Sequence, residues 1–161
     1  MENTPNIGEI KQTTEQAKAR LLKTFGFVPD DKLTWSPSQS ARTALQIVAH
    51  CGMSNQAFAT LLRGEELDFP SDPKEAAALI RQGGQDIATR EEAIQLLDTA
   101  TAAVIQALDK ATPELLASSP NSPFGPLPYT FWMGVPSMHM SGHANQIDYI
   151  QTIWGDYQDH M

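Results

Sequence analysis

The stretch Met138-His139-Met140-Ser141-Gly142-His143-Ala144-Asn145-Gln146 carries two histidines four residues apart. On an α-helix this spacing is about one turn, so both imidazoles project from one face, roughly 6 Å apart along the axis. Nitrogens placed in this way can converge on one metal ion. The chain has 4 histidines, and another of them, His50, lies far upstream. An imidazole from another helix would complete a facial set and leave a position open for water or substrate.

The rest of the chain predicts helices separated by loops rich in proline, glycine and serine. Apolar residues recur every three or four positions in four long segments, at residues 6–25, 40–63, 90–111 and 131–154. Two shorter helices are expected in the connections, at 73–82 and 113–116. No segment shows the alternation of a strand. The sequence therefore predicts an all-α, four-helix bundle with short extra helices in its connections, as one domain over residues 1–161.

Bundles build metal sites in their cores from side chains on facing helices. His139, His143 and Gln146 share one stripe of the last helix, and His50 lies among apolar residues of the second long helix. Such surroundings keep an imidazole neutral and able to bind metal. The competing interpretation is that these are buried histidines satisfied by hydrogen bonds. This competing interpretation is favoured for His50 taken alone. For the pair His139 and His143 the two interpretations are about equally supported, and for all three histidines together a metal site is favoured.

Composition argues against several classes of protein. A net charge of -8 disfavours a nucleic-acid partner, because proteins that bind phosphate backbones carry basic faces. No apolar run approaches the roughly 18 residues of a membrane span, and the acidic, polar start shows no secretory signal. One cysteine forms no internal disulfide, which agrees with the cytoplasm. We expect Cys51 to be a small buried residue and His160 to lie in a frayed, solvated tail.

Three stretches resemble the DinB-like family of four-helix bundles, whose pattern is a histidine in the second helix and H-x3-H in the fourth. The stretches are Leu33–Pro37, Ala44–His50 and His139–Ile147. Helix order and loop positions agree over essentially the whole chain. Two positions depart from the family's pattern. Met140 stands where many relatives carry an acidic residue, and Pro136 lies close to the first histidine of the pair, where the last helix could begin late or kink.

The resemblance implies a metal site and a range of activities. Its ligands would be His50, His139 and His143, holding a divalent ion, most often zinc or nickel, with water at the open positions. Gln146 would lie beside these ligands. Relatives include transferases and isomerases that use low-molecular-weight thiols as co-substrates, and others with an inferred hydrolase role. A homodimer and a small-molecule substrate are implied in the same way.

Two classes of function stay open on the sequence. One is a metal-dependent transferase or hydrolase; the other is a non-catalytic bundle that binds a metal or a ligand. An acid-rich site would support hydrolysis, and a positive pocket able to hold the carboxylates of a thiol would support transfer. The sequence does not decide between hydrolysis and transfer, because it does not show which arginines reach the site. Four of them lie near helix ends: Arg42, Arg63, Arg81 and Arg90. We expect the active end near the proline-rich loop 117–130, with Thr14 and Thr101 as small core residues or cavity lining.

Overall fold

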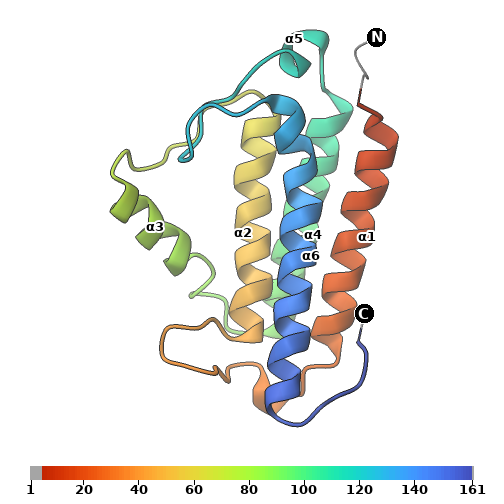
Figure 1. The fold of residues 1–161 in the computed structure, drawn as a ribbon, viewed down its shortest axis with the longest axis vertical. Helices are drawn as coiled ribbons and strands as arrows, with labels where there is room; N and C mark the ends of the chain where they lie inside the picture. The colour runs from red at the N-terminus through yellow and green to blue at the C-terminus, as the bar shows by residue number, and fades with distance from the viewer. Residues whose placement is uncertain (1–4, 161) are drawn as a thin grey trace.

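The computed structural model describes residues 5–160, and within that range it contains helices and no strand. Four long helices form the bundle: α1 (Ile7–Gly26), α2 (Ala44–Leu62), α4 (Arg90–Asp109) and α6 (Tyr129–Ile153). Three short helices lie in the connections: η1 (Asp30–Lys32), α3 (Pro73–Gln82) and α5 (Pro113–Leu116). The predicted all-α, four-helix bundle with short extra helices is confirmed (Figure 1).

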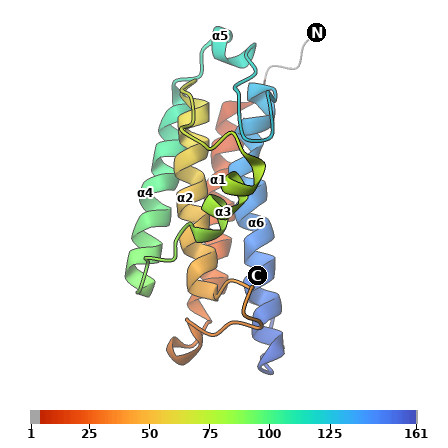
Figure 2. The same ribbon diagram turned by 90° about the vertical axis from the view of Figure 1, so that its left-hand side faces the viewer.

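The path of the chain sets which helices are neighbours. In Figure 1, α1 and α6 run downward, whereas α2 and α4 run upward. The most extensive packing is between α2 and α4 and between α1 and α6, and α2 also packs against α6. Because α2 and α4 point the same way, the chain must return between them. The return is made by α3, which stands outside the bundle and crosses in front of α2 and α6 in Figure 2.

Local signals fix where the two site-bearing helices begin. Thr43 Oγ1 accepts from the Gln46 amide at 3.1 Å, and Gln46 Oε1 accepts from the Thr43 amide at 3.0 Å, so α2 begins with a capping box. This start is four residues later than the expected position 40. The last helix begins earlier than expected, at Tyr129, and Pro136 lies inside it. His139 therefore occupies the helix interior, one turn beyond the proline.

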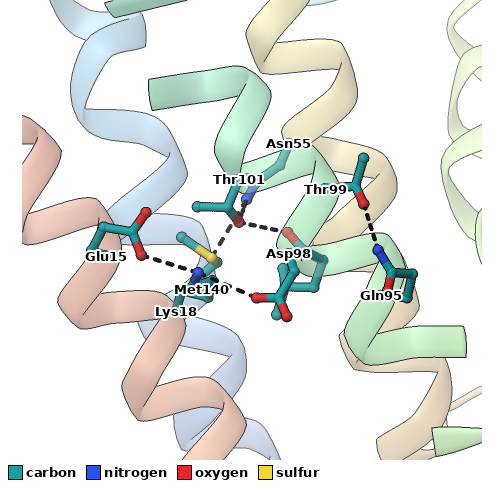
Figure 3. A network of polar contacts seen from close by, with 9 residues as sticks. Glu15, Lys18, Asn55, Gln95, Asp98, Thr99, Thr101 and Met140 are labelled. Atoms are coloured by element: carbon teal, nitrogen blue, oxygen red, sulfur yellow. Dashed lines mark hydrogen bonds and ion pairs between the residues drawn. The ribbon is translucent and has the colours of Figure 1, made fainter. Parts of the chain in front are cut away.

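The core consists of two apolar clusters stacked along the bundle axis. One includes Leu21, Ile47 and Ile147, and the other includes Leu62 and Tyr129. A buried polar contact comes from helix positions between those of the two clusters (Figure 3): the Asn55 amide donates to Thr101 Oγ1 at 3.0 Å and reaches Met140 Sδ at 3.5 Å. Thr101 is thus a core residue that joins α2 to α4. No described helix combines the length and apolar character needed to cross a membrane.

The expectation of a solvated tail at His160 is wrong. Its side chain is only 2% exposed, and its ring stacks on Phe27 with centroids 4.3 Å apart. Its Nε2 lies 2.9 Å from Asp156 Oδ2, and Thr24 Oγ1 donates to its carbonyl oxygen. The tail therefore folds back over the ends of α1 and α6, a contact between distant segments that helical periodicity does not reveal.

Arg90 stabilises the end of α1, and its loss should lower stability. Its guanidinium donates to Phe25 O at 2.9 Å and Val28 O at 2.6 Å and lies 4.8 Å from the Phe25 ring centroid. Charged hydrogen bonds contribute about 1.5–3 kcal/mol each, so we expect Arg90→Met to lower the free energy of unfolding by about 2–3 kcal/mol in urea titrations.

Arg63→Met is the matched control for this prediction. Arg63 is an exposed arginine at the end of α2 whose ion partner is Glu65. Such surface pairs contribute about 0–1 kcal/mol, so its urea midpoint should barely move. Equal midpoints for the two variants would show that Arg90 does not hold the α1 terminus.

Candidate metal centre

Three histidines from two adjacent helices meet inside the bundle. His50 extends from α2, and His139 and His143 extend from one face of α6. The His50 ring centroid lies 5.0 Å from each of the other two, which are 4.4 Å apart. One nitrogen from each ring can be chosen so that all three lie within 4.8 Å of one another. The structure thus brings together the three residues that the sequence nominated, in a group that could hold a metal ion.

The distances suit a divalent transition metal. Nitrogens bound to zinc at about 2.0–2.1 Å lie about 2.9–3.4 Å apart for bond angles of about 90–110°. His139 Nε2 and His143 Nε2 are 3.2 Å apart. The separations that involve His50 are within 4.8 Å, so small side-chain rotations suffice to bring its nitrogen to a shared ion. Imidazole nitrogens favour zinc, copper, iron and nickel over the hard ions magnesium and calcium.

Gln146 fixes the tautomer of His143. Its Oε1 lies 2.7 Å from His143 Nδ1. A carboxamide oxygen only accepts hydrogen bonds, so Nδ1 must carry the proton and Nε2 presents its lone pair toward His139. A hydrogen bond of this kind orients a metal-binding imidazole and raises its basicity. The structure therefore places Gln146 in contact with the cluster, where it was expected.

Burial keeps all three imidazoles neutral. Desolvation, followed by the positive charge of Arg42, lowers the pKa of His50 to about 4. Desolvation, followed by the neighbouring histidines, lowers the pKa of His139 to about 3. The pKa of His143 is also lowered by burial, against a smaller opposing effect of Gln146. At pH 7 the cluster therefore offers lone pairs and carries no positive charge, as metal binding requires.

A cleft of about 950 Å³ adjoins the cluster. Gln146 forms part of its wall, together with Ile47 and two arginines, Arg42 and Arg81. Because these residues come from the start of α2, the end of α3 and the second half of α6, the cleft lies toward the end of the bundle opposite α5 (Figure 1). The expectation of an active end near loop 117–130 is therefore wrong, and Thr14 and Thr101 are buried outside the cleft lining.

Two contacts hold α3 and the turn after it against the start of α2, beside the histidine cluster. Arg42 Nη2 donates to Ile80 O at 2.9 Å. Gly84, at φ 85°, comes so close to α2 that an added Cβ would lie 2.7 Å from Ala49 Cβ and 3.1 Å from His50 N. Sequence reasoning missed this glycine, although Gly83-Gly84 after a short helix is a signal of a tight turn.

Among residues 5–160, no carboxylate and no thiol lines the cleft. Cys51 is fully buried, and burial raises the pKa of its thiol, so it is not a nucleophile. Its role as a small core residue is confirmed. The chemistry available to the cleft comes from imidazoles, guanidinium groups and carboxamides.

The fold and the centre define a class of protein: a four-helix bundle with a three-histidine cluster between its second and last long helices. A model of the DinB superfamily matches residues 13–147, and the chain belongs to this superfamily. The solved structure of a conserved protein from Enterococcus faecalis has a TM-score of 0.70 at 15% identity, covering 95% of this chain and 99% of that one. A DinB-like protein from Bacillus subtilis has a TM-score of 0.65 at 15% identity, covering 93% and 94%. Comparison with curated proteins gives no match.

Substituting Gly84 should disturb the centre as well as the fold. In Gly84→Ala the new Cβ meets Ala49 and the His50 backbone, and the residue must also keep a positive φ. We expect a loss of more than about 2 kcal/mol in the free energy of unfolding, together with altered NMR shifts of the His50 ring.

The matched control for Gly84→Ala is Gly125→Ala. Gly125 has nearly the same φ, 86°, but nothing lies within 4 Å of its added Cβ. In Gly125→Ala the free energy of unfolding should fall only by the cost of the left-handed backbone, about 1–2 kcal/mol. The NMR signals of the His50 ring should not change. Equal losses in the two variants would mean that the 83–85 segment does not pack tightly on α2.

Proposed function

We propose that this protein is a metal-dependent enzyme that acts on a small molecule, with His50, His139 and His143 as the ligands of one divalent ion. The observation that carries the proposal is the convergence of three neutral imidazoles beside an open cleft. Structural zinc sites are closed by four protein ligands, whereas catalytic sites use three and keep a position for water or substrate. The bundle also has an extensive apolar core, so it does not depend on an ion for folding.

Within this class, transfer is favoured over hydrolysis. A bound zinc or nickel ion supplies an open coordination position that lowers the pKa of a bound water or thiol. Hydrolysis through such a water is assisted by a carboxylate general base, and no acidic side chain of the described part of the chain lines the cleft. The arginines of the cleft instead suit the carboxylates of a low-molecular-weight thiol co-substrate. We therefore propose a thiol-dependent transferase, in which Gln146 orients His143 and the α3 wall encloses the reactants.

The missing general base also fits the second candidate, a bundle that binds metal or ligand without catalysis. The two are separated by incubating the metal-loaded protein with a thiol and a panel of electrophiles and measuring thiol consumption. Thiol consumption that disappears in a His139→Ala protein supports the transferase, and the absence of consumption across the panel leaves the binding function.

A homodimer and a cytoplasmic location complete the proposal. Phe131 and Met138 on α6 are exposed apolar side chains that a dimer interface would cover.

Removing any one ligand should abolish stable metal binding. His50→Ala, His139→Ala and His143→Ala each leave two imidazoles, which hold a divalent ion far more weakly than three. We expect metal content, measured by inductively coupled plasma mass spectrometry, to fall from about one ion per chain to below about 0.1. Circular dichroism should remain helical. His160→Gln is the control, because that histidine lies in the tail and should leave metal content unchanged. Full occupancy in His139→Ala would refute the three-histidine assignment.

Gln146 should affect how tightly the ion binds rather than whether it binds. Gln146→Leu keeps a side chain of similar size but removes the acceptor for His143 Nδ1. Loss of such a partner weakens metal affinity about 10–100-fold. Competition with a chromogenic chelator measures the change, with Gln95→Leu on α4 as the control. Unchanged affinity would mean that the hydrogen bond does not orient the ligand.

A further inference from the structure

The charge of the cleft is opposite to that of the chain. The sequence carries 19 acidic and 11 basic side chains, for a net charge of -8. The residues that the structure shows in the cleft wall nevertheless include Arg42 and Arg81 and no acidic residue. Two guanidinium groups at one concave surface of an acidic protein produce a local positive potential that attracts anions.

Neither arginine of the cleft is neutralised by the protein. Within residues 5–160, ion pairs engage Arg63 with Glu65 and Arg90 with Asp30, but none engages Arg42 or Arg81. Burial lowers the pKa of Arg42, and the nearby charge of Arg81 has a smaller effect in the same direction. Arg42 donates from Nη2 to Ile80 O, but its buried Nε has no hydrogen-bond partner. A partly buried positive charge without an ionic partner is costly, and an anion would offset the cost.

Gln146 connects the cleft with the histidines. Its side chain lines the cleft, and its Oε1 lies 2.7 Å from His143 Nδ1. Ile47, about one turn before His50 on α2, also lines the cleft. The arginines and the residues next to the histidine cluster therefore face the same cleft.

The remaining lining indicates an organic anion rather than a bare inorganic one. Carboxamides from Gln39, Gln46 and Gln85 can donate to or accept from polar groups, and Tyr149 and Ile150 provide apolar surface. The volume of about 950 Å³ lies at the upper end of the range for small-molecule sites.

We propose that Arg42 and Arg81 form an anion subsite that binds the carboxylate or phosphate group of a small organic substrate and thereby directs its other end toward the three-histidine centre. The role in substrate binding rests on the proposed function, but binding of an anion to the arginines does not require the metal. Arginine matches the two oxygens of a carboxylate or phosphate with a pair of hydrogen bonds.

Glutarate and its neutral diamide, glutaramide, are matched probes for this subsite. Isothermal titration calorimetry with the metal-free and the metal-loaded full chain should show glutarate binding in both forms and glutaramide binding at least tenfold more weakly. Arg81→Gln should weaken glutarate binding at least fivefold in both forms. Among the described residues Arg81 is exposed and forms no ion pair, so the fold of this variant should be intact, whereas Arg42→Gln also removes the hydrogen bond to Ile80 O and is the second variant.

Arg63→Gln is the control for the arginine substitutions. It removes one positive charge at the far end of α2 and should leave glutarate affinity unchanged. The inference is overturned if glutarate does not bind to the wild type, if glutaramide binds as well as glutarate, or if Arg81→Gln and Arg63→Gln behave alike. Metal content measured after reconstitution of the same samples separates the two proposals. A protein that takes up no metal but binds glutarate through its arginines would overturn the metal centre alone, and a protein that takes up metal but shows no arginine-dependent binding would overturn the subsite alone.

Discussion

The packing of α2 against α6 forces three imidazoles into one partly dehydrated space, and the rest of the centre follows from that constraint. A charged imidazole is poorly solvated there, so the rings stay neutral and their lone pairs face one another. His139 Nε2 and His143 Nε2 lie 3.2 Å apart, within hydrogen-bond distance, and Gln146 holds the proton of His143 on the opposite nitrogen. A divalent cation would take the place of this hydrogen bond. The burial that keeps the rings neutral therefore also suits them to hold a metal ion.

The histidine cluster could be predicted from sequence because most of its geometry is local. The spacing between His139 and His143 sets their relation on any helix, and Gln146 is fixed by the same periodicity. Only the meeting with His50 required the fold, and the order of four amphipathic helices supplied it. The start of α2 was also encoded locally: Thr43 and Gln46 have the spacing of a capping box, a signal that places the first turn at Ala44.

The location of the cleft could not be predicted, because it depends on contacts between distant segments. Arg42, Arg63, Arg81 and Arg90 all lie near helix ends, and nothing in their immediate sequence separates them. In the fold, Arg63 pairs with a neighbour two residues away, Arg90 caps α1, and the other two face the cleft. Arg42 and Arg81 come together because α3 returns along the outside of the bundle to the start of α2. His160 is a similar case, since only the return of the tail to α1 buries it.

The histidine cluster and the arginines of the cleft belong to structurally different parts of the chain. The three histidines lie on α2 and α6, which belong to the packed core. Arg81 lies in the last turn of α3 and Gln85 in the turn that follows it. Ala76 is the buried residue of this helix, which rests on the bundle through Gly84 and Arg42. Substitutions on α3 therefore disturb little of the core. A bundle of this design can keep its three histidines while its outer connection changes, because the histidines and α3 depend on different packing contacts. Under the proposed function, the histidine cluster would set the class of chemistry and the α3 connection would select the molecules that reach it.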